Sequence, residues 1–145
     1  GTARYPLAMV RRLILPMVIV SLTVASTASA KLVQFRTPSG NIGCIGETVK
    51  AENFVRCDIR NRTWSPPPKP ASCELDWGQG LNLNRLGRAR YVCAGDTALN
   101  TGPKLAYGTQ RKVGAITCIS RTTGLTCTNA AKHGFTMNRT RVTRF

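Results

Sequence analysis

Acidic residues and histidine are scarce in this 145-residue chain, which has six Asp and Glu against 21 Lys and Arg, and one histidine, His133. The carboxylates nowhere follow the spacing of a calcium loop. A single histidine and the lack of any C-x-x-C pair argue against zinc. The sequence therefore predicts neither a metal site nor another cofactor.

The imbalance of charge points to anionic partners. The formal net charge is +15, and the basic residues are spread along the chain rather than gathered in one tail. Such a charge attracts polyanions, among them nucleic acid, lipid headgroups and phosphate-bearing wall polymers, without selecting one of them. Nucleic-acid binding on this basis would be non-specific. A solvated basic surface that keeps the protein soluble is the alternative interpretation.

Motifs for nucleophilic catalysis are also missing. The chain has no G-x-S-x-G elbow and no glycine-rich phosphate loop, and its cysteines are expected to be oxidised. Because imidazole titrates near neutral pH, His133 with Asp96 or Glu47 is the candidate acid–base set. Alternatively, His133 is a turn residue that forms local hydrogen bonds before Gly134. We favour a non-catalytic protein, with a small phosphodiesterase- or ribonuclease-like hydrolase as the alternative.

No apolar run is long enough to span a bilayer, which takes roughly 20 residues. The run Leu13–Val24 follows Arg11 and Arg12 and precedes the small residues Ala28-Ser29-Ala30. This order is typical of a secretion signal that is cleaved after that triplet. Residues 1–8 read as an upstream extension of a signal that starts at Met9. We expect residues 31–145 to be exported, and either secreted or held at the cell envelope, with no transmembrane anchor left.

Six cysteines follow the predicted signal, and none lies within it. An even number of cysteines in an exported chain indicates structural disulfides. Of the fifteen possible pairings we favour the sequential one, because each pair then links two neighbouring strand-like segments through a polar or glycine-rich turn. These pairs are Cys44–Cys57, Cys73–Cys93 and Cys118–Cys127.

Short β-type segments recur along residues 31–145, separated by turn residues roughly every 8–12 positions. No segment has the periodicity of an amphipathic helix. The pattern predicts one all-β domain, a small disulfide-linked sandwich or barrel, with an extended proline-rich surface loop at residues 66–70. The predicted strands are Leu32–Arg36, Asn41–Ile45, Phe54–Ile59, Leu81–Asn84, Tyr91–Cys93, Lys104–Tyr107, Val113–Ser120, Leu125–Asn129 and Gly134–Val142.

Two of these segments resemble each other. Asn41–Ile45 and Ala115–Ile119 share an Ile-x-Cys-Ile core, and each precedes a second cysteine. An internal duplication produces this likeness, and so does similar strand geometry around two unrelated disulfides. The sequence leaves both explanations open.

Two arginine pairs are the main candidates for binding. On a strand, Arg88 and Arg90 share one face, as do Arg139 and Arg141. Two such faces side by side form a stripe suited to a phosphate- or uronate-bearing polymer. The alternative is a pair of solvated edge strands that charge protects from aggregation.

Trp77 is a further binding candidate, since it lies next to a carboxylate and after the proline run. An exposed indole there can stack on a sugar ring or pack against a proline-rich partner. Alternatively, Trp64 and Trp77 fold onto their own proline loop, because large rings stabilise a small domain by burial.

Several motifs carry a resemblance to a known family: Phe35–Cys44, Gly87–Asp96, Gly124–Asn129 and the segment His133-Gly134-Phe135. Through them the chain resembles small exported actinobacterial proteins, notably mycobacterial ones, that form a domain of unknown function. The resemblance implies secretion and a disulfide-bonded domain, and it supplies no catalytic residue. Lys132 occupies a position where the resemblance leads us to expect a small residue such as glycine.

The observations together favour non-catalytic binding to an anionic component of the cell envelope. The hydrolase that uses His133 is the second hypothesis, and a host- or phage-directed interaction protein is the third. Ligand identity and oligomeric state are not specified by the sequence.

Overall fold

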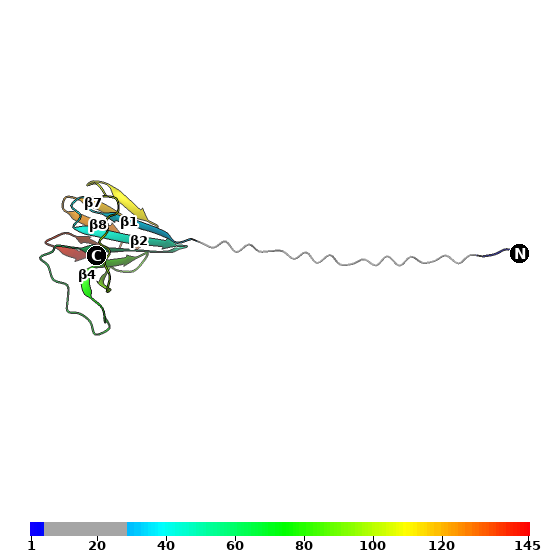
Figure 1. The fold of residues 1–145 in the computed structure, drawn as a ribbon, viewed down its shortest axis with the longest axis horizontal. Helices are drawn as coiled ribbons and strands as arrows, with labels where there is room; N and C mark the ends of the chain where they lie inside the picture. The colour runs from blue at the N-terminus through cyan, green and yellow to red at the C-terminus, as the bar shows by residue number, and fades with distance from the viewer. Residues whose placement is uncertain (5–28) are drawn as a thin grey trace.

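The computed structural model describes residues 1–4 and 29–145, and the described residues form ten strands and no helix. The strands build two five-stranded antiparallel sheets, each a meander in which consecutive strands are neighbours (Figure 1). This confirms the all-β prediction. The first sheet contains β1 (Lys31–Arg36), β2 (Ile42–Val49), β3 (Glu52–Ile59), β4 (Trp77–Asn84) and β5 (Arg90–Cys93). The second contains β6 (Gln110–Val113), β7 (Ile116–Arg121), β8 (Gly124–Thr128), β9 (Gly134–Met137) and β10 (Val142–Arg144).

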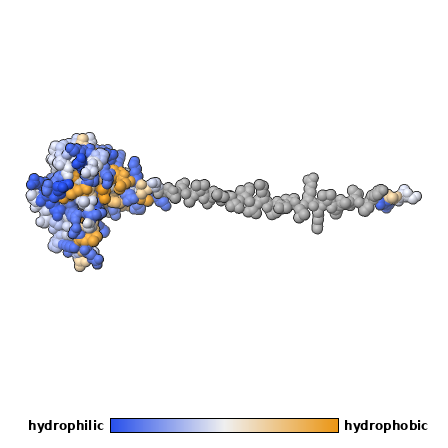
Figure 2. Space-filling view, viewed as in Figure 1, coloured by the Kyte–Doolittle hydropathy of each residue, from blue (hydrophilic) through white to orange (hydrophobic). Residues whose placement is uncertain are grey.

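The two sheets pack face to face on one apolar core. Alternate residues along each strand point inward, as the two-residue period of a half-buried strand requires. Val55 and Leu81 of the first sheet join Ile116 and Phe135 of the second in a single cluster of buried side chains. The opposite faces are largely polar, and hydrophilic residues cover most of the visible face of the domain (Figure 2).

The three disulfides are the sequential pairs favoured from the sequence. Cys44–Cys57 joins directly opposed residues of β2 and β3, with Cα atoms 4.1 Å apart, and Cys118–Cys127 does the same for β7 and β8 at 4.0 Å. Cys73–Cys93 ties the long 60–76 loop, which projects from the domain in Figure 1, to β5. Three disulfides are typical of extracytoplasmic proteins.

Three of the strand predictions were wrong in detail. Residues 104–107 form only a single bridge, between Lys104 and Arg36, and then turn towards β6. The segment 113–120 is divided by a tight turn in which Gly114 has a φ of 56°, a left-handed conformation that glycine adopts freely. The segment 134–142 is divided at Asn138, whose side-chain oxygen accepts the amide hydrogens of the turn.

The meander topology separates the connections into two groups. The β1–β2, β7–β8 and β9–β10 turns and the β3–β4 loop lie at one end of the sandwich, here called the β1–β2 end. The β2–β3, β4–β5, β6–β7 and β8–β9 connections lie at the opposite end, the β2–β3 end. The predicted secretion signal falls largely on residues 5–28 and thus lies outside the described residues. In the described part of the chain, no helix has the length and apolarity needed to cross a membrane.

Candidate functional site

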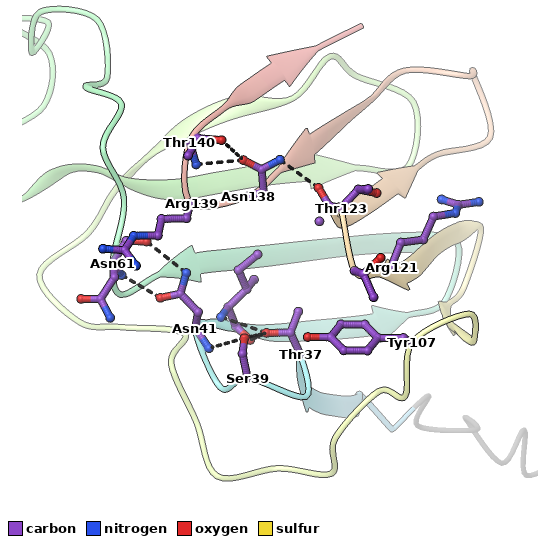
Figure 3. Close-up of a pocket in the computed structure, with 13 residues that line it drawn as sticks. Thr37, Ser39, Asn41, Asn61, Tyr107, Arg121, Thr123, Asn138, Arg139 and Thr140 are labelled. Carbon is purple, nitrogen blue, oxygen red and sulfur yellow. Dashed lines mark hydrogen bonds between the residues drawn. The ribbon is translucent and has the colours of Figure 1, made fainter.

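A hollow of about 560 Å³ opens at the β1–β2 end, between turns that come from both sheets. This end groove lies within the range of roughly 300–1,000 Å³ that is typical of small-ligand sites. Its walls are rich in hydroxyl and amide side chains, and Tyr107 stands at one side of it, near Arg121 (Figure 3). The lining residues are Thr37, Ser39, Asn41, Ile42, Asn61, Tyr107, Arg121, Thr122, Thr123, Gly124, Asn138, Arg139 and Thr140.

Asn138 fixes one wall of the end groove. Its Oδ1 accepts hydrogen bonds from the backbone N–H groups of Thr140 and Arg141, at 2.9 and 2.8 Å, and closes the β9–β10 turn. Its Nδ2 donates to the carbonyl oxygen of Thr123, 2.8 Å away in the β7–β8 turn. One amide side chain therefore holds the two turns that carry Arg139 and Arg121.

Asn41 fixes the opposite wall in a similar way. It belongs to the β1–β2 turn, and its Nδ2 donates to the carbonyl oxygen of Asn61 at 3.0 Å while its Oδ1 accepts the Asn61 N–H at 2.8 Å (Figure 3). Farther along the same loop, the N–H of Thr63 donates to the carbonyl oxygen of Arg139. The Asn41 bonds join two connections of the first sheet, and the Thr63 bond joins this loop to the β9–β10 turn of the second sheet.

The end groove is positively charged. Arg121 and Arg139 are both exposed, and no carboxylate is among the lining residues. A second hollow of about 590 Å³ shares Asn61 and Arg139 with it and adds Arg60 and Arg62. Together they offer four arginine side chains along one continuous surface.

The acidic residue that lines the second hollow, Asp58, is buried and ion-paired with Arg56. It is 1% exposed and accepts two hydrogen bonds from Arg56, at 3.1 and 2.7 Å, and one from the N–H of Ala98. Arg56 also donates to Asp96 at 2.6 Å. Within the described residues, these are the ion pairs that the structure contains.

The pKa values of Arg56 and Asp96 are both shifted. Burial lowers the pKa of Arg56, but hydrogen bonds and attraction from Asp58 and Asp96 outweigh burial, so its pKa lies above the ordinary value. The hydrogen bond from Arg56, followed by its positive charge, lowers the pKa of Asp96. Arg56 thus remains charged, and both carboxylates around it serve to hold the 96–98 segment against β3.

The prediction that Arg139 and Arg141 share one face of a strand is wrong. Residues 138–141 form the β9–β10 turn instead of a strand, because the Asn138 side chain and the N–H of Asn138, which bonds to the Arg141 carbonyl oxygen, close the chain there. Arg139 nevertheless lines both hollows of the β1–β2 end. Arg141 lines neither of them.

Arg88 and Arg90 lie elsewhere, so the four arginines do not form the single stripe expected from the sequence. Arg90 opens β5 and Arg88 precedes it, in the connection from β4 at the β2–β3 end. Both line a separate hollow of about 670 Å³ on the outer face of the first sheet.

The two tryptophans are fastened to the protein's own loops. The indole N–H of Trp77 donates to the carbonyl oxygen of Pro67 at 2.8 Å, and its ring packs against Tyr91 with centroids 5.9 Å apart. Trp64 donates to the carbonyl oxygen of Asn138 and packs against the core. The Trp77 contact matches the alternative in which a tryptophan folds onto the proline loop, whereas Trp64 binds the β9–β10 turn instead.

The three candidate catalytic residues are distributed over the molecule. His133 lies in the β8–β9 connection at the β2–β3 end, where its backbone N–H donates to Asn129 Oδ1 at 3.0 Å. Asp96 follows β5 at the other end and binds Arg56. Glu47 lies in β2, opposite Phe54. Among the described residues, no hydrogen bond or ion pair joins any two of these three.

Sequence reasoning missed Tyr107, Arg121, Arg60 and Arg62. Each lies in or beside a turn, and Tyr107 was assigned to a predicted strand that the structure does not contain. The position of Arg121 could have been inferred from the sequence, because the turn 121–124 separates two predicted strands. The meander order then places it at the same end as the β1–β2 turn.

The fold and the groove define a small, disulfide-bonded, all-β domain with basic surface hollows. The chain belongs to the family of unknown function DUF6636, which it matches over residues 14–145. This confirms the resemblance to an uncharacterised domain. Searches of the curated proteins and of the solved structures found no match.

Proposed function

We propose that this protein is a non-catalytic binding protein, exported from the cell, that holds an anionic polymer of the cell envelope at its β1–β2 end. The polymer lies along the end groove and the adjoining hollow and pairs with Arg121, Arg139, Arg60 and Arg62. The observation that carries the proposal is the charge of this surface, which presents four arginines and one buried carboxylate that is ion-paired with Arg56.

The chemistry of the lining supports binding rather than turnover. Guanidinium groups pair with carboxylate or phosphate through two parallel hydrogen bonds. The hydroxyl and amide side chains around them are suited to hydrogen bonding with a polar chain. No imidazole, thiol or unpaired carboxylate lines the two hollows to move a proton or attack a substrate.

The test is cosedimentation of oxidised residues 31–145 with purified envelope fractions at about 0.15 M and about 1 M salt, where charges are screened over about 8 and 3 Å. We expect binding at the lower concentration and its loss at the higher one. The double variant Arg121→Gln/Arg139→Gln should bind about 10- to 100-fold more weakly, since each arginine contributes hydrogen bonds to a charged group.

The matched control is Lys104→Gln/Lys112→Gln, which removes the same charge from exposed positions outside both hollows. It should retain nearly all binding, and His133→Ala should have no effect. If the two double variants weaken binding equally, the polymer is attracted by the overall positive charge of the protein and not by the end groove. Binding that survives high salt unchanged would contradict the proposal.

A further inference from the structure

The outer face of the first sheet holds an apolar pair in polar surroundings. Strand register places Ile45, Arg56, Asn82 and Arg90 in one row across β2, β3, β4 and β5, and places Phe54 in the next row. Ile45 and Phe54 are half-buried although they point away from the core. The segment 96–100 covers this face beside Gly43, Asp58 and Arg56, towards the β1–β2 end.

The hollow around this pair is basic on one side. Arg88 and Arg90 are exposed, no carboxylate is among its lining residues, and the third arginine, Arg56, is held by its ion pairs. The side chains of Asn82 and Asn84 lie between the arginines and the apolar pair. Across the strands the face therefore offers the apolar pair, the ion-paired Arg56 beside it, then the amides, and last the exposed Arg88 and Arg90.

Carboxylates bound the hollow on its other side. Glu47 and Glu52 line a separate depression beyond Phe54 and Asn84. An anionic group is thus attracted towards Arg88 and Arg90 and repelled from the far side of Phe54. A ligand with an apolar ring face, hydroxyl groups and one acidic group has the matching order of features.

We propose that this outer-face site binds an acidic sugar residue, with the sugar ring on Phe54 and Ile45, its hydroxyls on the two asparagines, and its acidic group on Arg88 and Arg90. The inference rests on the proposed function, because it makes the bound polymer an acidic polysaccharide. No residue lines both this site and the two hollows of the β1–β2 end. One chain then holds two separate segments of polymer and cross-links them.

Stoichiometry tests this directly. Calorimetric titration with a hexuronate tetrasaccharide should show two bound per wild-type chain. One should remain in Arg88→Gln/Arg90→Gln and one in Arg121→Gln/Arg139→Gln, while Lys104→Gln/Lys112→Gln keeps two. With a long polyhexuronate, the wild type should give turbidity that rises and then falls with polymer concentration, and either site variant should bind without turbidity.

Recognition of the ring is tested with Phe54→Leu, which keeps an apolar side chain but removes the flat aromatic face. It should weaken tetrasaccharide binding at the outer-face site at least fivefold and leave binding of inorganic polyphosphate unchanged. If Arg88→Gln/Arg90→Gln weakens both polymers equally and Phe54→Leu affects neither, sugar recognition is wrong and only charge acts there.

The remaining outcomes separate the two proposals. One tetrasaccharide per wild-type chain, lost only in Arg121→Gln/Arg139→Gln, would overturn the outer-face site and leave the proposed function intact. Failure of the wild type to bind polyhexuronate, polyphosphate or envelope fractions at low salt would overturn both.

Discussion

At the scale of single residues, Arg56 is the side chain on which the surface around the sites depends. Its guanidinium binds Asp58 within β3 and reaches Asp96, forty positions along the chain, which orders the segment after β5. Such a buried charge is costly when its partner is removed, about 3–5 kcal/mol. The cluster lies between the outer-face site and the hollows of the β1–β2 end, and it holds the Asp58 carboxylate buried against Arg56 rather than against Arg60 or Arg62.

Asp96 makes part of this stability dependent on pH. Because the pKa of Asp96 is lower in the folded protein, its contribution is present above the ordinary value of 3.8 and is lost as the pH falls through the folded-state value. We expect acidification from about pH 5 to about pH 2 to lower the urea midpoint more in the wild type than in Asp96→Asn. Glu74→Gln, which removes an exposed carboxylate without an ion pair, should follow the wild type. If the urea midpoint falls with pH equally in Asp96→Asn and in the wild type, Asp96 is not the source of this pH dependence.

Lys132 has a backbone conformation that lowers the stability of the folded protein. Its φ of 66° lies in the left-handed region, which costs a side chain with a Cβ roughly 1–2 kcal/mol. We expect Lys132→Gly to raise the free energy of unfolding by about 1 kcal/mol, measured by urea denaturation. Lys132→Ala separates charge from conformation, since it keeps the Cβ and should bring no such gain. An equal gain in both variants would make charge, rather than backbone strain, the cause.

At the scale of elements, the sequence predicts strands well where one face is buried. Alternation around Cys44, Cys57 and Leu81 identified β2, β3 and β4, because inward positions there must be apolar. The same rule failed at Asn138, where a side chain rather than a glycine or proline makes the turn. It also failed for 104–107, whose mixture of apolar and polar residues resembles a strand although only Lys104 pairs.

The candidate sites, like the strands, were predictable from the sequence only in part. The sequence identified Arg88, Arg90 and Arg139 as candidate binding residues, because clusters of arginine are visible without any structure. Their distribution over two hollows was not predictable, since it depends on which turns share an end of the sandwich. Tyr107 and Arg121 required the fold as well, because 106–109 crosses from the edge of the first sheet to the edge of the second and brings Tyr107 to the end groove.

At the scale of the whole molecule, the two sheets repeat one pattern. Each is a five-stranded meander whose second and third strands carry a cross-strand disulfide. In each, the fourth strand has a glycine, Gly80 or Gly134, whose position leaves no room for a Cβ beside the carbonyl oxygen of the second cysteine, Cys57 or Cys127. The likeness seen in the sequence around Cys44 and Cys118 therefore extends to strand order, register and packing, well beyond similar geometry around a disulfide.

The repeated sheets nevertheless share one core, which predicts how the molecule unfolds. Val55 and Leu81 lose their covering if Ile116 and Phe135 leave, so neither sheet is buried without the other. Replacing Cys118 and Cys127 by Ala should lower the free energy of unfolding by about 2–3 kcal/mol through the lost nine-residue link. If unfolding is cooperative, the slowest-exchanging amides of β3 should then exchange roughly 30- to 150-fold faster, by the same factor as those of β8. Faster exchange confined to the second sheet would mean that the two sheets unfold as independent units.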